Sequence, residues 1–146
     1  IMGHSHGGWL GPMVAAEYPN FLAGSFAEGW GNITALYGQT PGLLNRINHE
    51  NLWSDGKTLY ENPERYIQVS PIFREEFTQN IPSLLEFGEV SNSVAGLELA
   101  KALWRQGTPH KLVLYPNTGH NIREPQKHVE SMERNLQWFE QWMGRE

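Results

Sequence analysis

The 146-residue sequence contains no cysteine. This absence excludes a disulfide framework, a thiolate metal site and a cysteine nucleophile, and it leaves the redox compartment open. The sequence also has no apolar run of about 18 residues, the length that a membrane-spanning helix needs. No membrane span is therefore expected. Residues 1–10 do not have the basic and apolar pattern of a secretory signal peptide. If the true N-terminus lies outside this sequence, their pattern says nothing about the parent protein, and the localisation stays open.

Basic residues are few. There are 11 Lys and Arg against 16 Asp and Glu, which gives a formal net charge of −5 at pH 7. Nucleic-acid binding needs a basic surface, so no nucleic-acid partner is expected. Hydrophobic residues make up 39% of the chain and six residues are tryptophan, which is enough for a packed core. The length suits one domain.

The apolar pattern predicts an α/β fold. Strands are predicted at 21–27, 82–87 and 110–115, and helices from residue 5 or 6 to 18 and at 61–69, 92–106 and 125–143. Residues 28–56 lack a clear period and are interpreted as loop with short helical pieces. The last helix is amphipathic, with Met132, Leu136, Phe139 and Met143 on one stripe. Strands that alternate with helices indicate a mainly parallel sheet with helices on both faces.

Residues 3–7 read Gly-His-Ser-His-Gly, the G-x-S-x-G pattern of a nucleophile elbow. The two glycines let a strand turn sharply into a helix, and this turn exposes the hydroxyl of Ser5. A buried strand of about five apolar residues should come before such an elbow. Only Ile1 and Met2 do so here. The pattern therefore predicts that the sequence is a segment of a longer protein.

A serine hydroxyl needs a neighbouring base before it can act as a nucleophile. The strand predicted at 110–115 is followed by a turn-rich segment that ends in Gly119-His120. The carboxyl ends of parallel strands meet at one edge of a sheet, so we expect Ser5 and His120 to lie together there. Two simpler interpretations stay open: Ser5 as a helix N-cap, and His120 as a loop histidine without a partner.

Several stretches together resemble the C-terminal part of an α/β-hydrolase catalytic domain of the prolyl oligopeptidase family, which includes dipeptidyl, acylaminoacyl and glutamyl peptidases. They are GHSHGGWL at 3–10, VSPIF at 69–73, IPSLLEFGEVSNSV at 81–94, ELAKALWRQGTPHKLVLYPNTGH at 98–120 and NLQWFEQWM at 135–143. The resemblance implies that residues 1–146 form this C-terminal part. The N-terminal strands and any β-propeller would then lie outside the sequence, and this missing part of the same protein would be a partner of the segment.

The resemblance also implies roles for individual residues. Ser5 would be the nucleophile, His120 the base, and the backbone N–H of His6 half of the oxyanion hole. The candidate residues of the substrate pocket are aromatic, namely Trp30, Tyr37 and Trp53. No cofactor is expected. No metal is expected either, because the His4-x-His6 pair has no further clustered ligand.

The third member of the triad departs from the family pattern. The family has a His-Gly-x-x-Asp-x-x-Val turn, and the corresponding residues 87–94 read FGEVSNSV, which puts Ser91 at the position of the acid. A serine cannot supply the negative charge that stabilises an imidazolium. Glu89 is a candidate substitute if the loop is remodelled, and the reach of Asp55 is left open. Ser91 also suits the N-cap of the helix that follows.

The predicted function is that of a serine peptidase-like hydrolase. It would cleave peptide bonds of short peptides through an acyl-enzyme, with impairment expected from Ser91. An esterase of the same fold, acting on a small ester, is one alternative. A catalytically inactive homologue that serves as a binding or scaffold protein is another.

Overall fold

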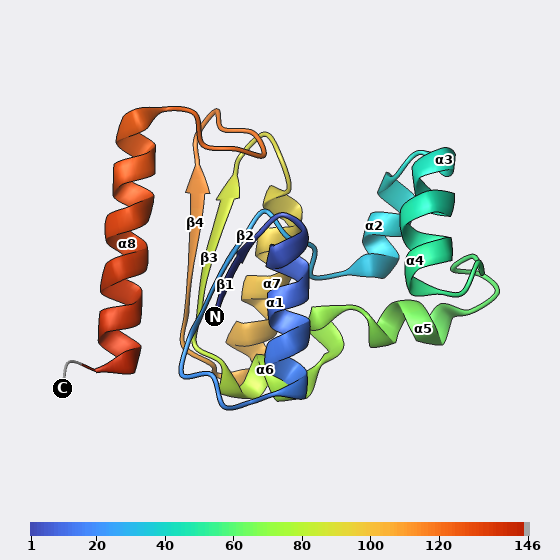
Figure 1. Cartoon of the computed structure of the whole chain (residues 1–146), viewed down its shortest axis with the longest axis horizontal. Coiled ribbons are helices and arrows are strands. Elements are labelled where there is room, and N and C mark those ends of the chain that lie inside the picture. The colour runs from blue at the N-terminus through green and yellow to red at the C-terminus, as the bar shows by residue number, and fades with distance from the viewer. Residues whose placement is uncertain (145–146) are drawn as a thin grey trace.

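The computed structural model describes residues 1–144, apart from the side chains of residues 45, 46 and 48. Its centre is a four-stranded sheet formed by β1 (Met2–His4), β2 (Gly24–Ala27), β3 (Ser83–Gly88) and β4 (His110–Tyr115). The strands lie side by side in chain order, and every neighbouring pair is parallel. The predicted parallel α/β architecture is confirmed (Figure 1).

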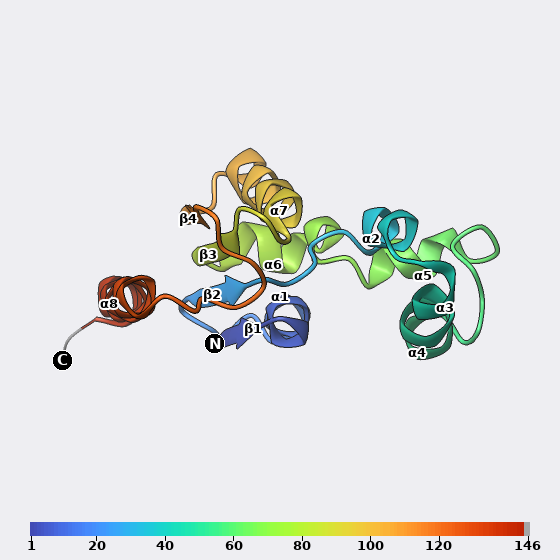
Figure 2. The same ribbon diagram turned by 90° about the horizontal axis from the view of Figure 1, so that it is seen from above.

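Helices cover both faces of the sheet (Figure 2). One face carries α1 (His6–Glu17), α6 (Glu75–Asn80) and α7 (Ser93–Gln106), and α8 (Pro125–Met143) lies on the other. The main core is on the first face. It contains the buried residues Ala15, Ala16, Phe26, Phe77, Ile81, Leu85, Phe87, Leu99 and Leu103. Leu84 of β3, in contrast, packs with Trp138 of α8 on the second face. Alternate residues of β3 thus point to opposite faces of the sheet.

The predicted element bounds agree best in the second half of the chain. The strand predicted at 110–115 and the helix predicted at 125–143 have the observed bounds. Helix α7 ends at Gly107, whose φ of 74° is the left-handed conformation of a glycine cap. Helix α6 was not predicted. Its six residues are too few to display a helical period.

Residues between β2 and α6 form a small helical lobe, seen on the right of Figure 1. Its elements are α2 (Ile33–Gln39), α3 (Gly42–Leu44), the π-helix η1 (Asn45–Glu50), α4 (Asn51–Trp53), α5 (Pro63–Gln68) and the 3₁₀-helix η2 (Pro71–Phe73). The predicted short helical pieces are thus confirmed. Trp9 of α1 packs into this lobe, and its indole N–H donates to the carbonyl of Val69 at 2.7 Å.

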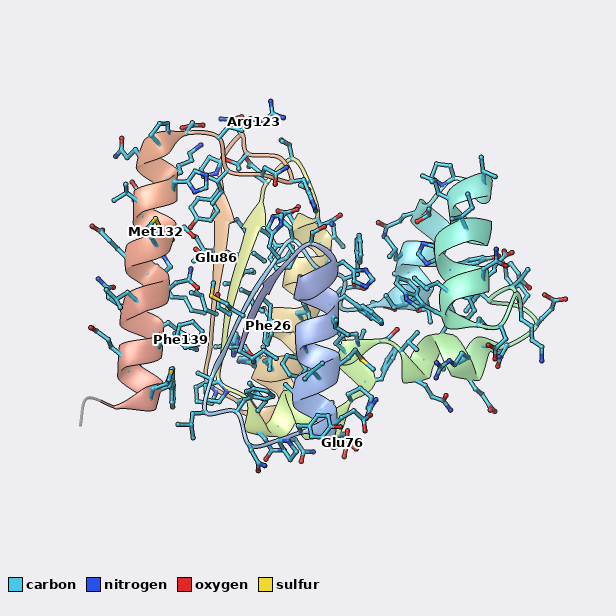
Figure 3. All side chains as sticks on the ribbon, viewed as in Figure 1. Phe26, Glu76, Glu86, Arg123, Met132 and Phe139 are labelled. Atoms are coloured by element: carbon cyan, nitrogen blue, oxygen red, sulfur yellow. The ribbon has the colours of Figure 1, made fainter. Side chains whose placement is uncertain are left out.

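Most of the apolar stripe of α8 is exposed in the described part of the chain. Met132, Leu136 and Met143 are 69%, 61% and 61% exposed. Trp138 is buried instead, with Phe139 packed beside it on the sheet side of the helix (Figure 3). Next to these apolar contacts, Glu86 of β3 makes polar contacts with α8.

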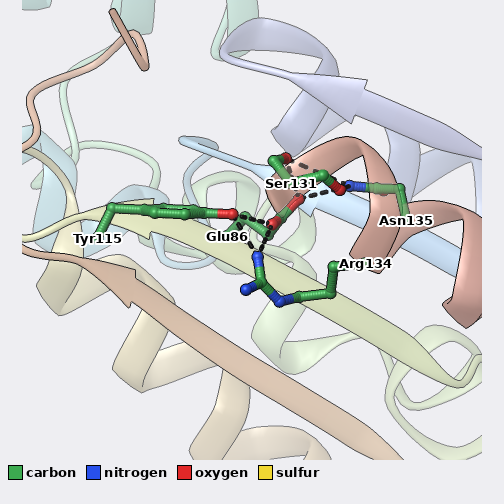
Figure 4. A network of polar contacts seen from close by, with 5 residues as sticks. All are labelled: Glu86, Tyr115, Ser131, Arg134 and Asn135. Atoms are coloured by element: carbon green, nitrogen blue, oxygen red, sulfur yellow. Dashed lines mark hydrogen bonds and ion pairs between the residues drawn. The ribbon is translucent and has the colours of Figure 1, made fainter. Parts of the chain in front are cut away.

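Glu86 of β3 is a buried charged residue beneath α8, with 4% exposure. Arg134 pairs with it at 3.1 Å, Asn135 and Ser131 donate at 2.6 and 3.0 Å, and the hydroxyl of Tyr115 also donates (Figure 4). A buried charge is tolerated only where it is paired and hydrogen-bonded. The network therefore fixes the rotation of α8 about its axis.

No helix in the described part of the chain is long and apolar enough to span a membrane.

Candidate active site

Ser5 lies at the corner between β1 and α1. Its φ of 60° and ψ of −119° are unusual for a residue with a side chain, and this kind of strain is typical of a nucleophile elbow. The corner is held by the Ser5 N–H, which donates to the carbonyl of Ala27 at 2.9 Å. Gly3 is needed beside it, because a Cβ at this position would lie 2.2 Å from the carbonyl oxygen of Gly7.

His120 lies beside Ser5, as the sequence predicted. Its Nε2 is 2.8 Å from the Ser5 Oγ, although 115 positions separate the two residues in the chain. The loop that carries His120 is anchored to the first turn of α8, where Lys127 Nζ donates to the carbonyl of Pro116 at 2.8 Å. The expected proximity of the two side chains is confirmed.

A carboxylate lies on the other nitrogen of the His120 ring, and it belongs to Glu28. Glu28 Oε2 is 3.2 Å from His120 Nδ1, and the residue is only 4% exposed. Two further donors reach the same carboxylate. The backbone N–H of Gly88 donates to Oε1 at 2.5 Å, and the hydroxyl of Ser91 donates to Oε2 at 2.6 Å. This buried charge is therefore compensated by three hydrogen bonds.

The structure locates the other candidate acids away from His120. Glu89 accepts a hydrogen bond from the backbone N–H of Asn117 at 3.0 Å, and Asp55 is exposed in the turn after α4. Ser91, at the position expected for the acid, donates its hydroxyl to the Glu28 carboxylate. Sequence reasoning misses Glu28 because the family pattern puts the acid after β3. One signal was available: Glu28 directly follows the strand that ends at Ala27, at the same sheet edge as Ser5.

The two histidines that flank Ser5 point to different partners. His4 Nε2 lies 2.9 Å from the backbone oxygen of His120, and the two rings are 5.0 Å apart. The His6 ring packs on Trp9 at 5.0 Å and stacks on Trp53 at 6.5 Å. Within residues 1–144, no group of three or more potential ligand side chains is arranged to hold a metal.

The three aromatic pocket candidates have different surroundings. Trp53 is buried in the core of the lobe, and the hydroxyl of Tyr37 donates to Glu50 at 2.9 Å. Burial and this carboxylate raise the pKa of Tyr37 above its usual value. Trp30 is half-buried and lines a small cavity of about 70 Å³ together with Ser91 and Asn92. Trp30 is therefore the one of these three candidates that lies beside Ser91 and Asn92, whose side chains donate to Glu28.

A larger cavity of about 520 Å³ lies between the strand ends and α8. His4, Glu28, His120, Tyr115 and His128 are among its lining residues. Burial and the bond to Glu86 raise the pKa of Tyr115 to about 12, since both disfavour the phenolate. The tyrosine wall of this cavity is accordingly uncharged at neutral pH.

Ser5, His120 and Glu28 thus form a continuous series of contacts from hydroxyl to imidazole to carboxylate. The model of the prolyl oligopeptidase family matches residues 1–146. The chain belongs to this family. Its curated relatives include the acylamino-acid-releasing enzyme of Rattus norvegicus, which is 26% identical over 161 residues, with 99% of this chain and 20% of that enzyme covered. The resemblance noted in the sequence is confirmed.

Solved structures of peptidases show the same fold. A puromycin-hydrolyzing peptidase of Mycobacterium tuberculosis has a TM-score of 0.87 at 21% identity, covering 100% of this chain and 22% of that one. An acylaminoacyl peptidase of Pyrococcus horikoshii has a TM-score of 0.75 at 21% identity, covering 97% of this chain and 23% of that one. The α/β-hydrolase fold is confirmed. The chain spans about a fifth of the length of these relatives.

Proposed function

We propose that the protein containing this chain is a serine peptidase that cleaves short peptides through an acyl-enzyme, with Ser5 as nucleophile and His120 as base. The observation that carries the proposal is the 2.8 Å contact between Ser5 Oγ and His120 Nε2. A base at hydrogen-bond distance from a strained, corner-mounted hydroxyl is what nucleophilic catalysis by serine requires.

The reaction proceeds in two halves. Ser5 Oγ attacks the carbonyl carbon of the scissile amide while His120 Nε2 takes the hydroxyl proton. His120 then gives this proton to the leaving nitrogen as the C–N bond breaks, which releases an amine and leaves the acyl group on Ser5. In the second half, water attacks the ester, and His120 takes a proton from the water and returns it to Ser5 Oγ. A carboxylic acid leaves, and the enzyme is restored.

The negative oxygen of each tetrahedral intermediate needs preorganised donors. His6 is the first residue of α1, so its backbone N–H has no acceptor within that helix. We assign this N–H to half of the oxyanion hole. Its position directly after the nucleophile is the one that nucleophile elbows use.

The substrate class is inferred from the names of the relatives and from the cavity beside the site. The rat relative is named for releasing acylamino acids, and the mycobacterial one for hydrolysing puromycin. We infer that this protein acts on small peptides with a free or acylated end. Trp30 would contact the substrate in the cavity beside Ser91, and Tyr37 and Trp53 would support that wall from the lobe.

Two other functions were open from the sequence. An esterase would use the same residues on an easier bond, so the ratio of amide to ester hydrolysis separates it from a peptidase. The inactive homologue was suggested by the serine at position 91. The contact of 3.2 Å between the Glu28 carboxylate and His120 Nδ1 favours the peptidase over that alternative, because it gives His120 a carboxylate although residue 91 is a serine.

Labelling with a fluorophosphonate probe tests the proposed function in the intact protein. We expect one labelled site, on the peptide that contains Ser5, and no label in Ser5→Ala. Hydrolysis of an acylaminoacyl p-nitroanilide should fall about 10⁴-fold or more in that variant. Ser93→Ala is the matched control, because the Ser93 hydroxyl donates to the backbone carbonyl of Glu89. An intact protein that takes no label, or that keeps it in Ser5→Ala, contradicts the proposal.

A further inference from the structure

We propose that Glu28 is the acid that orients His120, in place of the acid that the family resemblance puts at residue 91, and that Ser91 now positions Glu28. This inference rests on the proposed function. It moves the acid from the turn after β3 to the end of β2, the neighbouring strand. Glu28 acts through His120, so it is a positioning residue.

The first argument is the geometry of the imidazole ring. With its proton on Nδ1, His120 donates to Glu28 Oε2 at 3.2 Å, and Nε2 is then free to accept the proton of Ser5 at 2.8 Å. This is the tautomer that a serine nucleophile needs. When Nε2 takes the proton, the ring becomes an imidazolium in direct contact with a carboxylate that is 4% exposed. The Glu28 end of this contact is therefore shielded from water, whereas the His120 side chain is 41% exposed.

The second argument is the set of groups around the Glu28 carboxylate. Gly88 N–H and the Ser91 hydroxyl both point at it, at 2.5 and 2.6 Å. An apolar residue at 28 would remove this acceptor from the buried Gly88 N–H and the half-buried Ser91 hydroxyl. Ser91 thus occupies the position expected for the acid but has a complementary role, because its hydroxyl donates to a carboxylate that comes from elsewhere in the chain.

The third argument is the placement of the Glu28 backbone. Glu28 has a φ of 52°, an uncommon conformation for a residue with a side chain. The Glu28 N–H donates to the carbonyl of Glu86 at 3.2 Å. The Glu28 carbonyl accepts a hydrogen bond from Asn92 Nδ2 at 3.4 Å. These two bonds connect the end of β2 to β3 and to the start of α7. The backbone conformation that directs Glu28 toward His120 is therefore supported on both sides.

The closeness of positions 28 and 91 makes the proposal testable by exchange. Ser91 Oγ is 2.6 Å from the Glu28 oxygen that contacts His120. A carboxylate introduced at 91 would therefore be adjacent to the same imidazole nitrogen. In Glu28→Gln/Ser91→Asp, the negative charge is moved back to the turn after β3, and the amide oxygen introduced at position 28 can accept the Gly88 N–H.

The experiment measures kcat and KM for an acylaminoacyl p-nitroanilide, and the rate of fluorophosphonate labelling, in the intact protein. Glu28→Gln should lower kcat about 10³- to 10⁴-fold with KM nearly unchanged, as expected when the orienting acid of a triad is neutralised. Ser91→Ala should lower kcat about three- to tenfold. Glu89→Gln is the matched control: its amide oxygen still accepts the Asn117 N–H, and kcat should stay within about twofold.

The double variant separates a positioning role from a structural one. The kcat of Glu28→Gln/Ser91→Asp should be at least about tenfold higher than that of Glu28→Gln. If Glu28 only stabilised the fold, a carboxylate at position 91 would not restore kcat in this way. Wild-type kcat in Glu28→Gln, a large loss in Glu89→Gln, or no recovery in the double variant would each overturn the inference. Failure of the proposed function is distinguishable, because in that case the wild-type protein itself is not labelled on Ser5.

Discussion

At the scale of single residues, backbone strain is concentrated around the candidate site. Among the described residues, the non-glycine positions with positive φ are Ser5, Glu28, Asp55 and Asn117. Three of these four carry or flank the triad, since Asn117 lies in the loop before His120. Such conformations cost free energy and persist only where the surroundings hold them. The strain at Ser5 and Glu28 is thus part of how the two side chains reach His120.

Gly88 provides a test of how closely the His120 loop must approach β3. A Cβ at Gly88 would lie 2.1 Å from the carbonyl oxygen of Thr118, so the loop must move in Gly88→Ala. We expect kcat to fall at least about tenfold and the free energy of unfolding to fall by roughly 2 kcal/mol. Kinetic assays and urea unfolding measure the two effects.

Gly119→Ala is the control for this prediction. The residue lies in the same loop, but a Cβ there would have no atom within 4 Å. Both kcat and stability should remain close to wild type. Equal losses in the two variants would show that any alanine in this loop is harmful, and the close approach at Gly88 would then explain nothing.

The sequence was sufficient to predict two of the three side chains that meet at the site. Ser5 and His120 have local signals, namely a glycine-flanked serine and a histidine after the last strand. Glu28 has no motif of its own. Its role depends on the pairing of Ala27 with His4 and with Glu86, and strand pairing is a property of the sheet that no single stretch reveals.

At the scale of elements, the sequence predicted where helices lie better than which side they bury. The bounds of α8 follow from Pro125 at its start and its long apolar period. Its orientation depends on Glu86, a single buried charge on β3 that needs Arg134, Ser131 and Asn135. These polar contacts lie between β3 and α8, whereas Met132 and Leu136 of the stripe are exposed in the described structure.

Arg134→Met tests this polar contact between α8 and β3. The substitution removes the cation that faces a carboxylate with 5% side-chain exposure, and three neutral donors remain. We expect the intact protein to lose about 3 kcal/mol of stability in urea unfolding, because a buried charge is left without its partner.

Arg74→Met is the matched comparison. Arg74 is as exposed as Arg134, at 22%, but its partners Glu17 and Glu76 are 61% and 57% exposed. A surface pair of this kind contributes less than about 1 kcal/mol. Equal destabilisation by the two substitutions would mean that the burial of Glu86 does not determine the strength of the contact.

At the scale of the whole molecule, the parallel sheet is what brings the residues of the candidate site together. It places the carboxyl ends of β1, β2, β3 and β4 along one edge, and Ser5, Glu28, Gly88 and the His120 loop all lie at those ends. Residues from positions 5, 28 and 120 meet there although no local sequence connects them. The fold thus converts distant positions into one hydrogen-bonded series from hydroxyl to imidazole to carboxylate.

The most direct test of this account is mass spectrometry of the intact protein, quenched shortly after it is mixed with a p-nitrophenyl ester. We predict one acyl group per protein on the peptide that contains Ser5, formed at least about 10³-fold more slowly in His120→Ala. An acyl group on another side chain, no acyl group at all, or acylation at an unchanged rate in His120→Ala would contradict the account.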